Sequence, residues 1–263
     1  MILKLLQTTV DGFYATLPRR AARADALREC KIIGHRGQHD GNRSIKENTL
    51  AAFRACLDAD VWGVEMDIQW TRDGEPVILH DEHGLRVFND VSIRPSEMSF
   101  ADLSKKCPDI PSLEQVIDVL GGRIHLMLEL KPHGFKAEHI RRLTTLLQPL
   151  EPRRDYHLLS IYPEIFDHVG TITPQCFLPV AQTNTTRLFK TVLDKDFGGL
   201  TGHYLLLNRS MRTQLAQRKM KWGTGFVRST NVMHREASLG TNWVFTNCAV
   251  TLQTRVNDTW NRR

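Results

Sequence analysis

Two acidic residues, Glu65 and Asp67, stand two positions apart inside the apolar run WGVEMDIQW (62–70). Side chains alternate along a strand, so both carboxylates point to one face while Met66 points to the other. Neighbouring buried carboxylates repel each other unless a cation neutralises them. That cation could be a hard divalent ion with oxygen ligands, or an arginine or lysine. By the same alternation, LELK (128–131) turns Glu129 and Lys131 inward, as a third ligand beside a lysine or as a buried Glu–Lys pair.

Basic side chains end two further apolar runs, with His35 and Arg36 in KIIGHRG and His80 in VILHD. A histidine can act as acid or base near neutral pH. An arginine offers a planar fork to a phosphate, and a lysine offers a point charge. Taken singly, each could be a structural residue at a strand end whose polar atoms are hydrogen-bonded. Together the clusters match phosphoryl chemistry, in which cations stabilise charge while histidines exchange protons with the nucleophile and the leaving group.

The elements that must position these residues alternate after residue 30 between short apolar runs and runs of helical period. The predicted strands are 31–36, 62–70, 124–131, 156–160, 175–181, 203–208, 221–227 and 242–247, with a shorter extended piece at 75–81. Helices are expected at 48–59, 112–120 (Ser112 as N-cap) and 137–150, and from near 163, 186, 210 and 232. About eight strands, each followed by a helix, predict a TIM (β/α)₈ barrel. An open doubly wound sheet ranks second, because no G-x-G-x-x-G follows the first strand.

Two segments fall outside this alternation. Residues 82–110 predict a loop-rich insertion after the second strand, of the kind that shapes an active site. Residues 1–30 predict a helical extension packed on the barrel of residues 31–263. Its arginines at positions 19, 20, 23 and 28 form a solvated face or, less favoured, a surface for membrane contact.

Composition sets broad limits on the 263-residue chain. A formal charge of +6 favours anionic partners without choosing among them. Five widely spaced cysteines without C-x-x-C argue against a disulfide framework or a structural zinc site. No apolar run approaches the ~20 residues that span a bilayer, and at the N-terminus the basic residues follow the apolar stretch. We therefore expect a cytoplasmic protein. Scattered basic residues without interleaved aromatics disfavour nucleic acid as a partner, and the oligomeric state is left open.

The order and spacing of motifs over residues 31–131 resemble the glycerophosphodiester phosphodiesterase (GDPD) family. The matching motifs are H-R-G (35–37), E-N-T (47–49), A-F (52–53), E-x-D (65, 67), T-x-D-G (71, 73–74), H-D (80–81), Arg86, I-P-S-L-E (110–114) and L-E-L-K (128–131). Further on, S-I-Y-P-E (160–164) resembles the family's step after the fourth strand.

The resemblance implies a barrel, a divalent cation (Mg²⁺ or Ca²⁺) and hydrolysis of small-molecule glycerophosphodiesters to glycerol 3-phosphate and an alcohol. It also implies that the glycerol 2-hydroxyl is the internal nucleophile, through a cyclic phosphate that water opens. The roles it implies are metal binding by Glu65, Asp67 and Glu129, acid/base catalysis by His35 and His80, phosphate binding by Arg36 and Lys131, and support by Glu47 as a further ligand or by orienting a histidine.

Two departures from the family pattern fall late in the chain. The family's W-T-V-N is replaced by Gly225-Phe226-Val227-Arg228, and its final T-D by Thr246-Asn247. We expect both to affect alcohol specificity and neither to contact the metal or histidine residues. Two alternatives stay open: a lysophospholipase D acting on lipid phosphodiesters, and a non-catalytic barrel that binds phosphate esters.

Overall fold

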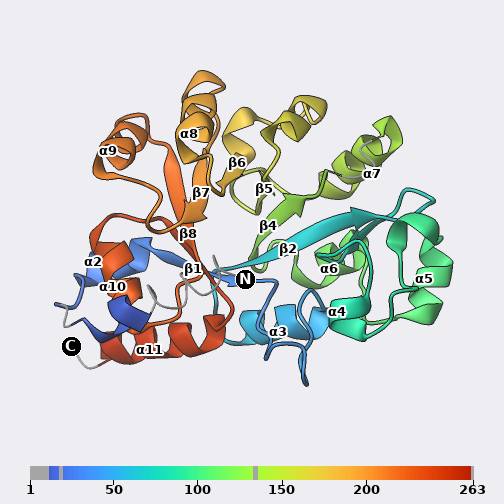
Figure 1. Ribbon diagram of the computed structural model, residues 1–263, viewed down its shortest axis with the longest axis horizontal. Coiled ribbons are helices and arrows are strands. Elements are labelled where there is room, and N and C mark those ends of the chain that lie inside the picture. The colour runs from blue at the N-terminus through green and yellow to red at the C-terminus, as the bar shows by residue number, and fades with distance from the viewer. Residues whose placement is uncertain (1–11, 18–19, 133–135, 262–263) are drawn as a thin grey trace.

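Eight parallel strands close into a barrel in the computed structural model, which describes residues 12–17, 20–132 and 136–261. The strands are β1 (Lys31–His35), β2 (Gly63–Trp70), β4 (His125–Leu130), β5 (Tyr156–Ser160), β6 (Phe177–Ala181), β7 (Gly199–His203), β8 (Lys221–Gly225) and β9 (Trp243–Thr246). β1 pairs with both β2 and β9, which closes the ring (Figure 1). The predicted TIM barrel is confirmed.

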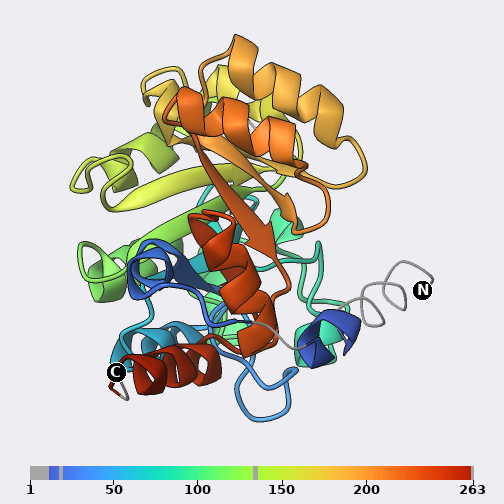
Figure 2. The same cartoon turned by 90° about the vertical axis from the view of Figure 1, so that its left-hand side faces the viewer.

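Helices surround the barrel, and the alternation of side chains along the strands explains why. In β2, Val64, Met66 and Ile68 face outward and join the main core beneath the helices. A second core inside the barrel contains Ile33 and Met127. The surrounding helices are α3 (Leu50–Asp58), α6 (Leu113–Leu120), α7 (Ala137–Leu147), α8 (Thr185–Asp194), α9 (Arg209–Gln217), α10 (Thr230–Ser238) and α11 (Ala249–Asn261), with the 3₁₀ helices η2 (Pro163–His168) and η3 (Pro174–Cys176) after β5. α11 packs beside α3, so the first and the last strand–helix units of the barrel lie side by side (Figure 2).

The insertion follows β3 (Pro76–Ile78), which pairs antiparallel with β2. It contains α4 (Leu85–Phe88), the 3₁₀ helix η1 (Pro95–Glu97) and α5 (Phe100–Lys106). Ile93, Leu103 and Ile110 form a small core with the β3 region. The insertion is therefore a packed unit rather than loop alone, and its helices are too short for a period of 3.6 to show in the sequence.

The strand predicted at 203–208 is wrong, because the strand is β7 at Gly199–His203. The reason lies in close packing between neighbouring strands. A Cβ atom at Gly199 would lie 2.0 Å from the carbonyl oxygen of Lys221 on β8. Glycines replace the apolar residues that would reveal this strand, while the apolar Tyr204 and Leu207 are buried beyond its end.

The described part of the N-terminal extension contacts α10. The helix α2 (Ala24–Glu29) packs on α10, and the Ala22 backbone N–H donates to His234 Nδ1 at 3.2 Å. Residues 1–11 and 18–19, Arg19 among them, lie outside the described residues. Within the described part of the chain, no helix is both long enough and apolar enough to cross a membrane.

Candidate active site

Three carboxylates meet inside the barrel at the carboxyl ends of two neighbouring strands. Glu65 and Asp67 come from β2 and Glu129 comes from β4, with Asp67 and Glu129 paired in register. One oxygen from each lies within 4.8 Å of the other two. Glu65 and Asp67 are buried, and Glu129 is half-buried. The structure thus brings together the three carboxylates expected from the sequence.

Two cations lie against this carboxylate cluster. Lys131 Nζ is 2.6 Å from Asp67 Oδ1 and 2.7 Å from Glu129 Oε1. Arg36 Nε is 3.3 Å from Asp67 Oδ2, and the Arg36 backbone N–H donates to Glu65 Oε2 at 3.0 Å. Burial works against ionisation of Asp67, but Lys131 and Arg36 overcome it and lower the pKa of Asp67. Burial and the neighbouring Asp67 raise the pKa of both Glu65 and Glu129.

The cluster fits a divalent cation. Among the described residues, three carboxylates face two cationic side chains in direct contact, so the carboxylates outnumber the cations within the cluster. Glu65 Oε1 is buried and accepts no hydrogen bond from any residue that the structure describes, which is costly unless another group binds it. Three carboxylate oxygens suit Mg²⁺ or Ca²⁺. The expected alternative, pairing with Lys and Arg, accounts for Asp67 but leaves this oxygen of Glu65 without a partner.

His35 ends β1 and lies beside the cluster. Its Nε2 is 3.9 Å from Glu65 Oε2, and its Nδ1 is 2.7 Å from Asn247 Oδ1. The ring of Phe226 meets it edge-on, with centroids 5.6 Å apart. Burial and the nearby Arg36 lower the pKa of His35 to about 4, so the neutral ring prevails at neutral pH.

From the sequence, residues 225–228 and 246–247, which depart from the family pattern, are not expected to contact the histidines. That expectation is wrong, since Phe226 and Asn247 both contact His35. The reason is barrel closure. Gly34 of β1 pairs with Thr246 of β9, so His35 and Asn247 leave neighbouring strands side by side. This pairing joins residues 212 positions apart, and no local pattern reports it.

His80 is held by a chain of ion pairs that crosses the mouth of the barrel. Its Nδ1 is 2.6 Å from Asp81 Oδ1, and Arg86 Nε donates to Asp81 Oδ2 at 2.6 Å. Arg86 also donates two bonds of 2.8 Å to Glu47, which accepts a third from Arg36 Nη1 at 2.8 Å. Both oxygens of Glu47 are therefore engaged by arginines. Among the described residues, Glu47 is linked to His80 through Arg86 and Asp81.

Sequence reasoning missed two asparagines at the site. Asn48 Nδ2 donates to Asp67 Oδ2 at 2.8 Å, and Asn247 contacts His35. Asn48 stands in the E-N-T motif beside Glu47, which was the available signal, whereas nothing around Asn247 marks it as a partner of His35. Asn48 also adopts a left-handed backbone, φ 57°, which non-glycine residues rarely do.

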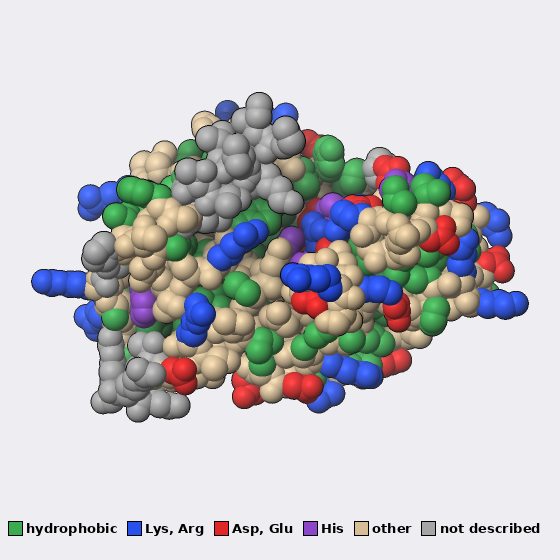
Figure 3. Space-filling view, turned by 60° about the horizontal axis from the view of Figure 1, so that its bottom comes forward, with side chains coloured by type: hydrophobic (Ala, Val, Ile, Leu, Met, Phe, Trp, Pro, Cys, Tyr) green, Lys and Arg blue, Asp and Glu red, His purple; other side chains and the backbone are tan. Residues whose placement is uncertain are grey.

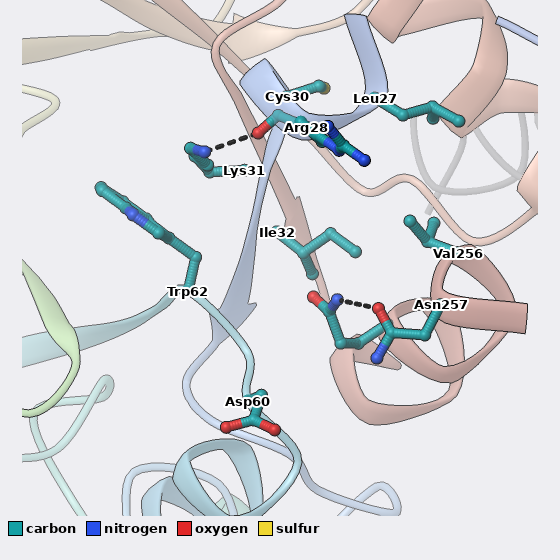
Figure 4. A pocket seen from close by; sticks show the side chains of 10 residues that line it. Leu27, Arg28, Cys30, Lys31, Ile32, Asp60, Trp62, Val256 and Asn257 are labelled. Atoms are coloured by element: carbon teal, nitrogen blue, oxygen red, sulfur yellow. Dashed lines mark hydrogen bonds between the residues drawn. The ribbon is translucent and has the colours of Figure 1, made fainter. Parts of the chain in front are cut away.

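One face of the molecule gathers acidic, basic and histidine side chains around a depression (Figure 3). A separate cavity of about 480 Å³ lies at the other end of the barrel, where β1 begins. Lys31, Trp62 and Asp60 line it, and Lys31 Nζ is bonded to the Arg28 carbonyl oxygen (Figure 4). None of the residues expected to act in catalysis lines this cavity.

Comparisons with known proteins point to one family. The model of the glycerophosphoryl diester phosphodiesterase family matches residues 35–164. Human glycerophosphodiester phosphodiesterase 1 is 34% identical over 119 residues, 40% of this chain and 35% of that protein. The glycerophosphodiester phosphodiesterase of Caldanaerobacter subterraneus is 31% identical over 113 residues, 38% of this chain and 44% of that protein. The matches thus span less than half of these relatives.

Solved structures share the fold along nearly the whole chain. A putative glycerophosphodiester phosphodiesterase from Galdieria sulphuraria has a TM-score of 0.75 at 19% identity, covering 91% of this chain and 100% of its own. An Oleispira antarctica phosphodiesterase, in complex with the product sn-glycerol-3-phosphate, has a TM-score of 0.73 at 21% identity, covering 88% and 99%. The matched motifs lie on the barrel strands that carry the carboxylates and histidines, and residues 35–164 of this chain match the glycerophosphoryl diester phosphodiesterase family.

Proposed function

We propose that the chain hydrolyses glycerophosphodiesters to glycerol 3-phosphate and an alcohol, with a divalent cation and two histidines. The observation that carries the proposal is the meeting of three carboxylates, two histidines, Arg36 and Lys131 at one end of the barrel. Phosphate binding alone does not need two proton-transfer groups. The names of the relatives support the same reaction, as does the product bound in the Oleispira enzyme.

In this proposal Glu65, Asp67 and Glu129 hold Mg²⁺ or Ca²⁺, which when bound supplies positive charge to the phosphoryl oxygens. Arg36 and Lys131 bind the phosphate, since both are cationic and lie within 3.3 Å of Asp67. The ion pair with Glu47 holds the Arg36 guanidinium in place before substrate arrives. Such preorganised charge stabilises a transition state without the cost of reorganising it.

His35 and His80 exchange the protons of the reaction. Each directs Nδ1 at a fixed partner, Asn247 in one case and Asp81 in the other. Each therefore keeps Nε2 for the substrate, as required of a group that takes a proton from the nucleophile or gives one to the leaving oxygen.

A lysophospholipase D is the second candidate, favoured by exposed apolar side chains on the insertion and beside His35. Leu85 and Val91 of the insertion are each 49% exposed, and Phe226 beside His35 is 40% exposed. An acyl chain on the leaving alcohol would find apolar contacts there. We also propose a cytoplasmic location, which is supported by five unpaired cysteine thiols, the state expected in a reducing compartment.

The test is a panel of glycerophosphocholine, glycerophosphoethanolamine and lysophospholipids assayed with Mg²⁺, Ca²⁺ or Mn²⁺ and with chelator. We expect turnover that chelation abolishes and a divalent ion restores. His35→Ala and His80→Ala should each abolish turnover and leave substrate affinity largely intact. His168→Ala, at an exposed histidine outside the site, is the matched control. Absence of activity on every substrate and metal contradicts the proposed reaction, and turnover that survives both histidine changes contradicts their assigned roles.

A further inference from the structure

We propose that Asn247 is a positioning residue that fixes the tautomer and the ring orientation of His35. The catalytic consequence rests on the proposed function, whereas the tautomer itself does not. Asn247 stands where the family pattern has an aspartate, so this chain places a neutral amide at that point.

The contacts of His35 determine where the proton of its neutral ring lies. Asn247 Oδ1 lies 2.7 Å from Nδ1, and an amide oxygen only accepts hydrogen bonds. Nδ1 must therefore carry the proton of the neutral ring, and Nε2 is left with a lone pair. That lone pair lies on the side of the carboxylate cluster, 3.9 Å from Glu65 Oε2. In water a neutral histidine is free to place its proton on either nitrogen, so the preference is imposed by Asn247.

Phe226 supports the ring from another side. Its ring stands at 66° to the imidazole with centroids 5.6 Å apart, which limits rotation of His35 about its Cβ–Cγ bond. Phe226 adopts a left-handed backbone, φ 65°, which bulky residues rarely tolerate unless their surroundings impose it. The next residue, Val227, donates its N–H to the Phe245 carbonyl oxygen at 3.3 Å and so holds this turn against β9. Amide and aromatic ring together restrict the orientation of the His35 ring.

The two histidines of the site thus differ in the chemistry of their partners. His80 meets the carboxylate of Asp81, which accepts a bond through either oxygen. An asparagine can present its oxygen or its NH₂ group, and only the oxygen specifies a proton on Nδ1. The orientation of the Asn247 amide is therefore the quantity to measure.

The experiment combines nitrogen NMR with steady-state kinetics. In the wild type, ¹⁵N NMR of His35 at slightly alkaline pH, assigned with His35→Gln, should show a protonated Nδ1 and a bare Nε2. Asn247→Leu keeps the size of the side chain and removes the acceptor, so the tautomer preference should be lost. Its kcat should fall on the order of 10²-fold, as expected when a reacting group is misplaced. KM should stay nearly constant, because Asn247 contacts Nδ1 and the proposed substrate contact is made by Nε2.

Two further variants separate positioning from stability. Asn247→Asp restores an acceptor and should recover most of the lost turnover and the protonated Nδ1. Asn242→Leu is the matched control. Asn242 lies at the opposite end of β9, where its Oδ1 accepts a hydrogen bond from the Trp222 backbone N–H. This substitution should alter thermal stability and leave kcat unchanged. If Asn247→Leu fails to fold, Asn247→Ala replaces it.

A wild-type His35 protonated on Nε2 overturns the proposal, and so does an Asn247→Leu enzyme that keeps both kcat and the Nδ1-protonated ring. Equal losses of kcat in Asn247→Leu and Asn242→Leu also overturn it, because the effect is then one of stability. Failure of the proposed function would look different: the wild type would turn over none of the substrates while the NMR result still decides the tautomer.

Discussion

Replacing Glu65 with glutamine should stabilise the metal-free protein while removing its response to metal. Glu65 is buried, its Oε1 has no hydrogen-bond partner in the described part of the chain, and Asp67 and Glu129 face it. Glutamine keeps one oxygen for the Arg36 N–H and puts an NH₂ donor where a repelled carboxylate oxygen stood. Relief of one unsatisfied buried group is worth about 1–3 kcal/mol. For a chain of this size that raises Tm by roughly 2–12 °C.

The sign of the pH dependence follows from the same contacts. Burial and Asp67 raise the pKa of Glu65 above its usual value of 4.5. A carboxyl group with a raised pKa in the folded state costs stability as pH rises above that usual value. Glu65→Gln removes this cost, so the variant's gain over the wild type should be larger at pH 7 than at pH 4.5.

The assay is thermal unfolding of both proteins in chelator and in saturating Mg²⁺ or Ca²⁺. An ion at about 100 times its Kd stabilises the wild type by about 2.7 kcal/mol, and the variant should show little of this increase. Glu236→Gln is the matched control, because Glu236 is also buried with a raised pKa, caused by burial, and lies on α10 away from the cluster. It should keep the full response to metal. A Glu65→Gln protein that is less stable than the wild type in chelator refutes the reasoning, as does one with an unchanged metal response.

Three further changes test the fold, at and away from the site. Burial lowers the pKa of His125 to about 4 and of its partner His157 to about 2, so stability should fall with pH below 6.5, by about 2 kcal/mol per histidine at pH 5. His157→Gln should reduce this loss in urea titrations at pH 8 and pH 5, and an unchanged loss would exclude the pair as its cause. Arg86→Leu leaves Glu47 with fewer donors and should lower both the free energy of unfolding, by about 1–3 kcal/mol, and turnover; retention of both would show that the arginine is dispensable. Ser112→Ala removes the capping box of α6 and should cost about 1 kcal/mol in the same titration without changing KM.

Local patterns predicted most of the barrel correctly. Strands such as β2 and β4 show the alternation of apolar and acidic residues, and the N-cap predicted at Ser112 is confirmed. β7 escaped prediction because glycines needed for close strand packing replace its apolar residues. No residue range is predicted for the helix after the last strand, which is α11 and packs against β1 and α3.

What the sequence by itself determined is the set of reactive groups before residue 132 and the faces that they share. Alternation along a strand is a property of neighbouring residues, so Glu65 and Asp67 had to point the same way. The tertiary structure decided which groups from distant segments meet. Closure of β1 on β9 put Asn247 on His35, and the packed insertion brought Arg86 to Glu47. Such contacts join residues far apart in the chain, and only the folded barrel specifies them.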